Sequence, residues 1–142
     1  MQLLADRLNF SNVSNVLSFS FRGCNLTDIS IFTQIPHIEV LTLSVNSILS
    51  LSPLSGCVCL SELYLRRNLV TSLSELSHLR PLTRLRVLWL AENPCCGTDP
   101  SQYRLNVLRC LPRLHKLDNQ GQLSSVETMF VFWGSMLPVL KP

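Results

Sequence analysis

The sequence predicts an α/β leucine-rich-repeat solenoid, with a short parallel sheet on the concave face and 3₁₀ or irregular segments on the convex side. Three observations support this fold class. Leucine supplies 29 of the 142 residues. The pattern L-x-x-L-x-L-x-x-N/C-x-L recurs four times, and apolar residues come at every third position between its copies. A pattern of this kind, repeated every 20–29 residues or so, is the signature of leucine-rich repeats.

The four copies of the pattern are Val16–Leu26, Ile38–Ile48, Leu60–Val70 and Leu85–Cys95. Within each copy the L-x-L positions alternate with outward-facing residues, which predicts a strand with one buried face. The Asn or Cys position of the pattern falls at Cys24, Asn46, Asn68 and Asn93, in steps of 22, 22 and 25 residues. We expect these side chains to point inward after each strand and to satisfy unpaired backbone groups.

The segments between the copies predict 3₁₀ turns, because their apolar period is 3.0 residues and not the 3.6 of an α-helix. The segment from Val70 to Leu85 contains one extra triplet, which explains the 25-residue step. Repeats of about 22 residues with this convex side are typical of intracellular proteins that resemble the regulatory subunit of protein phosphatase 1.

A solenoid needs capped ends, because a terminal repeat otherwise exposes its core. We expect residues 1–15 to form an N-terminal cap, residues 16–98 the repeats, and residues 99–120 a C-terminal cap. Residues 121–142 form an apolar tail that leaves the repeat pattern. This tail is either a product of gene model or splicing, or a segment that docks back on the solenoid.

The C-terminal cap is expected to contain a helix followed by a strand. Ser101–Arg109 places apolar residues at helical spacing, and Pro100 suits the first turn of a helix. The following leucines, Leu111, Leu114 and Leu117, are expected to lie on a final strand.

Composition favours a cytoplasmic protein without a membrane span. No apolar stretch reaches the ~18 residues of a transmembrane helix. Six cysteines occur without a secretory leader, which predicts free thiols in a reducing compartment. The net charge of +3 is mild for a nucleic-acid-binding protein, so nucleic acid is not an expected partner.

We expect neither catalysis nor a cofactor. The three histidines are separated from one another by one or more repeats, with His37 and His78 expected on convex segments and His115 on the final strand. The chain also has no Gly-rich phosphate loop or nucleophile elbow. Cys57, Cys59, Cys95 and Cys96 could supply four thiolates for zinc. The repeat frame places the two cysteine pairs at opposite edges, however, so we expect packing and no metal.

The concave face is the predicted partner-binding surface. Its candidate residues are Val40, Glu62, Tyr64, Arg66, Arg67, Val87, Trp89 and Glu92. Exposed Trp, Tyr and Arg dominate protein-binding hot spots, although strands favour aromatic and β-branched residues on any face. A second, basic cluster is either a solvated surface or a site for an acidic partner; its members are Arg80, Arg84, Arg86, Arg104, Arg109, Arg113 and Lys116.

Several strings closely resemble the leucine-rich-repeat half of the cilia- and flagella-associated protein 410 family. They are LTDIS (Leu26–Ser30), LTLSVNS (Leu41–Ser47), LSELYLRRN (Leu60–Asn68), LRVLWLAENPCCG (Leu85–Gly97) and LPRLHKLDNQ (Leu111–Gln120). The string WLAENPCCG is the most specific of them. The resemblance ends at about Gln120: the family continues into an acidic linker and a helical segment, whereas this chain carries the apolar tail.

This resemblance implies a non-enzymatic scaffold or adaptor that acts in cilium assembly at the ciliary base or basal body. It also implies basal-body proteins and a NIMA-related kinase as partners, and links to the cytoskeleton, cell shape and DNA damage. A regulatory subunit that grips a phosphatase or kinase through the concave face is the alternative function. No small-molecule substrate is expected in either case.

Overall fold

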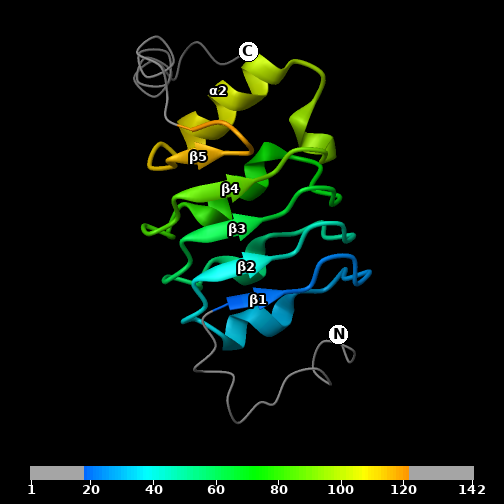
Figure 1. The fold of residues 1–142 in the computed structure, drawn as a ribbon, viewed down its shortest axis with the longest axis vertical. Helices are drawn as coiled ribbons and strands as arrows, with labels where there is room; N and C mark the ends of the chain where they lie inside the picture. Colours follow the sequence, from blue (N-terminus) through cyan, green and yellow to red (C-terminus); the bar gives the residue numbers. More distant parts are fainter. Residues whose placement is uncertain (1–17, 122–142) are drawn as a thin grey trace.

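Five short strands form one parallel sheet, and they follow one another in space in the order of the chain (Figure 1). The computed structural model describes residues 18–121. The strands are β1 (Ser18–Ser20), β2 (Val40–Thr42), β3 (Glu62–Tyr64), β4 (Val87–Trp89) and β5 (Lys116–Leu117). The expected N-terminal cap, the start of the first repeat, and the apolar tail from residue 122 lie outside the described residues.

The strands are in register, so equivalent residues of successive repeats lie side by side. Phe19 pairs with Leu41, Leu41 with Leu63, Leu63 with Leu88, and Leu88 with Leu117. These inward-facing residues stack into one continuous core, while their neighbours along each strand face the open side of the sheet. The predicted solenoid with a parallel sheet is therefore confirmed.

The convex side consists of short 3₁₀ turns, as the three-residue period predicts (Figure 1). They are η2 (Ser30–Gln34), η3 (Ser52–Leu54), η4 (Leu73–Leu79) and η5 (Pro94–Cys96). The turn η4 is the longest, with seven residues, and it lies in the repeat that carries the extra triplet.

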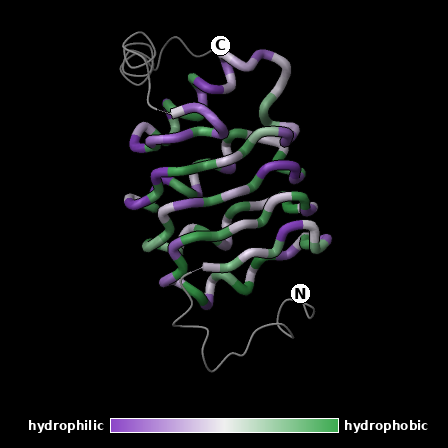
Figure 2. Tube along the Cα trace, viewed as in Figure 1, coloured by the Kyte–Doolittle hydropathy of each residue, from purple (hydrophilic) through white to green (hydrophobic). Residues whose placement is uncertain are grey.

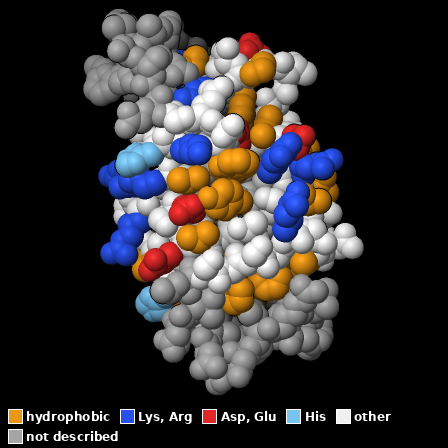
Figure 3. Space-filling model, in the orientation of Figure 1, with side chains coloured by type: hydrophobic (Ala, Val, Ile, Leu, Met, Phe, Trp, Pro, Cys, Tyr) orange, Lys and Arg blue, Asp and Glu red, His pale blue; other side chains and the backbone are white. Residues whose placement is uncertain are grey.

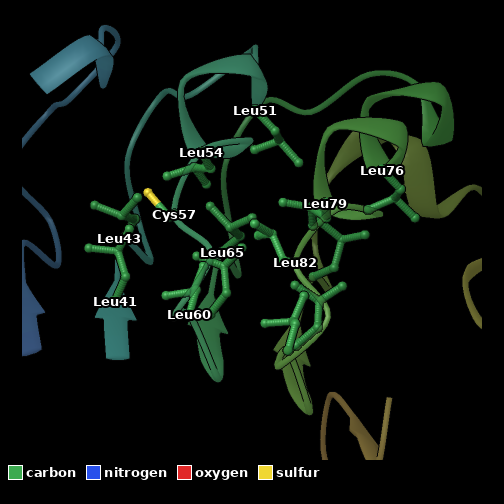
Figure 4. Packing of buried hydrophobic residues seen from close by; sticks show 14 of the residues in the cluster. Leu41, Leu43, Leu51, Leu54, Cys57, Leu60, Leu65, Leu76, Leu79 and Leu82 are labelled. Atoms are coloured by element: carbon green, nitrogen blue, oxygen red, sulfur yellow. The ribbon is translucent and has the colours of Figure 1, made fainter. Parts of the chain in front are cut away.

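The core fills the space between the sheet and these turns. Figure 4 shows side chains from both layers meeting, with Leu41 and Leu60 from the strand side and Leu54 and Leu79 from the convex side. All four are 0–1% exposed. Along the chain, hydrophobic and hydrophilic stretches alternate in each repeat (Figure 2), so every repeat contributes one layer to the same core.

The helix α2 (Pro100–Cys110) covers the end of the stack, and the side chain of Asp99 caps it by accepting hydrogen bonds from the backbone N–H groups of Ser101 and Gln102. The final strand is shorter than predicted, and the placement of Leu111 and Leu114 on it was wrong. Both residues precede β5 in turns, where the Leu114 N–H donates to the Leu111 carbonyl. They continue the three-residue period of the convex side into the core.

The chain folds back after β5. The backbone N–H and carbonyl groups of Leu117 both pair with Gln120, at 3.0 Å in each direction. The neighbouring N–H groups, of Lys116 and Asp118, instead donate toward β4.

Candidate functional site

Side-chain amides stabilise the turns that follow β2, β3 and β4, and we call these three asparagines, Asn46, Asn68 and Asn93, the amide ladder. Asn68 Oδ1 accepts a hydrogen bond from the Ile48 N–H at 3.1 Å, and Asn68 Nδ2 donates to the carbonyls of Leu43 and Leu65 at 3.0 Å. Asn46 and Asn93 make the equivalent bonds in their own repeats. Each amide thus joins its own repeat to the preceding one.

Cys24 occupies the same position in the first repeat, without a side-chain amide. Its backbone N–H donates to Asn46 Oδ1 at 3.0 Å, and its thiol donates to the Arg22 carbonyl at 3.6 Å. The three asparagines therefore bridge successive pairs of repeats from the first to the fourth.

Asp118 continues this series after β5 with a carboxylate, and the repeat pattern did not predict its role. Asp118 Oδ1 accepts from the N–H groups of Leu90 and Ala91, and Asp118 Oδ2 accepts from the Tyr103 hydroxyl at 2.8 Å. Burial, followed by the charge of Asp118, raises the pKa of Tyr103. A carboxylate cannot donate to carbonyls as an amide does, so a tyrosine from α2 completes the site. A polar residue directly after the final leucines was the available signal.

The open face of the sheet carries two rows of candidate partner-binding residues. Val40, Glu62 and Val87 are paired in one row across β2, β3 and β4. Tyr64 and Trp89 form the other row, next to Thr42 of β2. The structure thus brings these five predicted residues together on three adjacent strands.

Tyr64 and Trp89 form an aromatic patch in the middle of this face. Their ring centroids are 5.8 Å apart with an interplanar angle of 57°, and both side chains are half-buried. The Tyr64 hydroxyl donates to the Glu62 carboxylate, and this hydrogen bond raises the pKa of Tyr64 to about 12. Because Glu62 engages the hydroxyl, the ring is the part of Tyr64 that is available for contact.

Three further candidate residues form a charged rim in the turns after β3 and β4. Arg66 Nε lies 2.8 Å from Glu92 Oε2, and Arg67 Nε lies 3.5 Å from the same oxygen. All three side chains are exposed, so the ion pairs contribute little to stability. In Figure 3, hydrophobic side chains cross the middle of the sheet, and charged side chains lie on both sides of them.

Two rim residues have left-handed backbones. The φ angles of Arg67 and Glu92 are 58° and 62°. Gly23 and Val45 adopt the same conformation at the equivalent places, directly before the Asn or Cys position. Only Gly23 carries a sequence signal for this geometry, since the other residue types rarely adopt it. The turn thereby fixes where the rim side chains leave the backbone.

The cysteines are free thiols that differ in burial. Cys57 is fully buried, and its thiol donates to the Phe32 carbonyl at 3.5 Å. Burial raises the pKa of Cys57 to about 11 and, with the neighbouring Cys96, that of Cys95 to about 12. Among residues 18–121 no group of three His, Cys, Asp or Glu side chains is placed to hold a metal ion. The helices of these residues also include none that could span a bilayer.

Comparison with known proteins supports both the repeats and the resemblance. The family described as Leucine Rich repeats (2 copies) matches residues 36–78. Human cilia- and flagella-associated protein 410 is 58% identical over 120 residues, which are 84% of this chain and 47% of that protein. The mouse protein of the same name is 56% identical, with 84% and 48% covered. The chain thus spans about half the length of these curated relatives.

A solved structure with the same fold is the crystal structure of the Drosophila melanogaster SNF/U2A' complex. The matched chain has a TM-score of 0.65 at 20% sequence identity, and the match covers 82% of this chain and 79% of the other. At this identity the likeness concerns the fold alone.

Proposed function

The chain belongs to the cilia- and flagella-associated protein 410 family through its leucine-rich repeats, and on this premise we propose that it is a non-enzymatic scaffold that binds a protein partner on its concave face. The partner-binding residues in this proposal are those of the aromatic patch and the charged rim, together with Val40, Glu62 and Val87.

The aromatic patch is the observation that carries the proposal. The leucines of each strand face the core, so Tyr64 and Trp89 on the opposite face are not needed to fill it. Large aromatic side chains at the centre of an exposed surface supply much contact area at a small cost in conformational entropy. Arg66 and Arg67 lie beside them and can pair with carboxylates of a partner once Glu92 is displaced.

The names of the relatives support a role in the cilium. We place the activity in cilium assembly, at the ciliary base or basal body on the cytoplasmic side. Basal-body proteins and a NIMA-related kinase are the proposed partners, and effects on the cytoskeleton, on cell shape and on the response to DNA damage belong to the same proposal.

Affinity capture from ciliated cells tests this proposal. The full chain and a Tyr64→Ala/Arg66→Glu/Trp89→Ala variant serve as baits, and mass spectrometry identifies the bound proteins. We expect the variant to recover at least ~10-fold less of the basal-body proteins or kinase, because hot-spot residues dominate binding. Circular dichroism must show that the variant keeps the fold.

A matched control removes exposed apolar side chains and one cation away from the patch. Leu49 and Val58 are 57% and 52% exposed and lie outside the strands, so Leu49→Ser/Val58→Ser/Arg22→Glu should recover the same partners as the unchanged chain. Equal recovery by all three baits would contradict binding at the patch.

Peptide competition and an activity assay on the captured partner separate a scaffold from a regulatory subunit. A folded phosphatase or kinase domain needs an interface of about 800 Å² per partner, so a short peptide that covers only the patch would not displace it. Addition of the chain would also change the activity of a purified catalytic partner. If the chain is a scaffold that binds a linear segment, we expect the peptide to displace the partner fully and the catalytic activity of the partner to stay unchanged when the chain is added.

A further inference from the structure

A groove opens between the fourth repeat and the cap, on the side of the solenoid that leads into the strands. Its volume is about 360 Å³. We call it the cap groove; its apolar lining consists of Leu79, Leu82, Leu85, Leu111, Pro112 and Leu114.

The cap groove exists because the last interface of the stack is less tightly closed than the earlier ones. The residue that lies two positions before each strand becomes more exposed along the chain. Ile38 before β2 and Leu60 before β3 are 0% exposed, whereas Leu85 before β4 is 3% and Leu114 before β5 is 7% exposed. The residues three positions earlier follow the same trend: Ile35 and Cys57 are 0% exposed, Leu82 is 4% and Leu111 is 7% exposed. These leucines remain buried, but each is slightly more exposed than its equivalent in the earlier repeats, and together they form the apolar floor of the groove.

The rim of the cap groove is cationic. Arg80 and Arg113 line it from its two sides, and both are exposed. The segments 79–86 and 109–117 contain no Asp or Glu; their cations are Arg80, Arg84, Arg86, Arg109, Arg113 and Lys116. The ion pairs found among residues 18–121 do not include Arg80 or Arg113. Unlike the charged rim of the concave face, these two segments therefore supply no acidic side chain that could pair with Arg80 or Arg113.

We propose that the cap groove binds a segment of a partner protein in which acidic residues flank an apolar side chain. The apolar floor fits a leucine- or phenylalanine-like anchor, which gains free energy by leaving water. Carboxylates on either side of the anchor pair with Arg80 and Arg113, and arginine favours such pairs because its guanidinium can donate two parallel hydrogen bonds. A free inorganic anion could pair with the arginines but would leave the apolar floor of the groove in contact with water, so a peptide segment fits the groove better.

This surface is separate from the concave face of the proposed function. The cap groove is formed by segments that precede β4 and β5, whereas the aromatic patch lies on β3 and β4 facing the open side. The scaffold therefore has the means to hold two partner segments at once, or one partner at two places.

Selection from a peptide library tests the proposal directly. A phage-displayed library of random 16-residue peptides is selected on the full chain, and the enriched peptides are synthesised with a fluorophore for anisotropy titrations. We expect enriched sequences with Asp or Glu on both sides of Leu, Phe or Trp. Arg80→Glu/Arg113→Glu should weaken their binding at least ~10-fold, because each reversed charge repels the peptide.

A second variant acts through shape and not through charge. Thr83 is exposed and lines the cap groove, so Thr83→Trp should occupy the space of the anchor and weaken binding to a similar extent. Two controls match these changes: Arg22→Glu reverses a distant cation, and Ser77→Trp adds a tryptophan on η4 outside the groove. Both controls, and Trp89→Ala, should bind the peptides as the unchanged chain does.

Several results would overturn the proposal. These are the absence of enriched peptides, enrichment of peptides without acidic residues, and binding that Trp89→Ala abolishes while the groove variants retain it. Cosedimentation with phosphatidylserine–phosphatidylcholine vesicles gives the remaining outcome. Vesicle binding that requires Arg80 and Arg113, without any enriched peptide, would assign the surface to a membrane and not to a protein.

Discussion

The side chain of Asn68 shows how one residue holds two repeats together. Only 4% of it is exposed, and its amide satisfies one N–H group and two carbonyl groups of the backbone. Without it these groups would remain buried and without water, which costs more free energy than the hydrogen bonds themselves contribute. The sequence position alone predicted this role, because Asn in the repeat pattern always follows the strand at the same distance.

Asn68→Ala should lower the free energy of unfolding by ~1–3 kcal/mol, since it removes the partner of three buried backbone groups. Urea unfolding followed by circular dichroism measures the change. Asn119→Ala, at an exposed position of the cap, is the matched control and should leave the unfolding midpoint unchanged. Equal midpoints for both variants would show that the backbone groups find other partners.

At the scale of one element, the turn after each strand relies on a left-handed residue. Val45 has a φ of 59°, although it is β-branched and nothing in its side chain favours that conformation. The Val45 N–H donates to the Arg66 carbonyl at 2.8 Å, which shows what the turn gains from this geometry. The register between neighbouring repeats thus overrides the local preference of the residue.

Val45→Gly should raise the free energy of unfolding by about 0.5 kcal/mol. A left-handed backbone costs an ordinary residue ~1–2 kcal/mol, and the entropic cost of glycine offsets part of the gain. Thermal or urea unfolding checks the sign. Thr42→Gly, in the strand β2 of the same repeat, should instead destabilise the protein, and a similar loss in both variants would mean that the packing of Val45 outweighs its strain.

The elements also show what the sequence could and could not predict. The strands and convex turns follow from periods of two and three residues, which are local properties of the chain. The length of β5 was overestimated because a leucine at every third position fits either a turn or the approach to a strand. Asp118 and Tyr103 were missed because their hydrogen bond joins positions 15 residues apart with no repeat to align them.

The candidate site divides in the same way. The register placed Tyr64 beside Trp89, as equivalent positions in adjacent repeats must be. The pairing of Glu92 with Arg66 and Arg67 depends on the left-handed backbones of Arg67 and Glu92, which these residue types do not predict. The cap groove depends on how closely the cap approaches the fourth repeat, a distance that no pattern encodes.

For the whole molecule, thiols raised in pKa by burial and a phenol raised in pKa by its hydrogen bond to Glu62 shape the response to alkaline pH. The folded protein raises the pKa of Cys57 to about 11 and those of Cys95 and Tyr64 to about 12. In the unfolded chain these groups ionise at their ordinary values, near 9 for thiols and near 10 for phenols. Above pH 9 the unfolded state therefore binds fewer protons than the folded state, and stability falls as pH rises.

The free energy of unfolding should be nearly constant below pH 8.5 with respect to these groups and should decrease from pH 9 to pH 11. Cys57→Ala removes one of the groups, so its curve should fall less steeply, by up to about 2 kcal/mol over this interval. Urea unfolding at a series of pH values under reducing conditions gives both curves. Parallel curves would contradict the assignment of the effect to Cys57.

The fold-back after β5 has a consequence for how copies of this protein can associate. Strands at the edge of a sheet invite pairing with another chain, and open-ended repeat stacks could in principle grow into filaments. At this end Gln120 occupies the outward N–H and carbonyl groups of Leu117. A strand of another copy therefore finds no free backbone group at Leu117 with which to extend the sheet beyond β5.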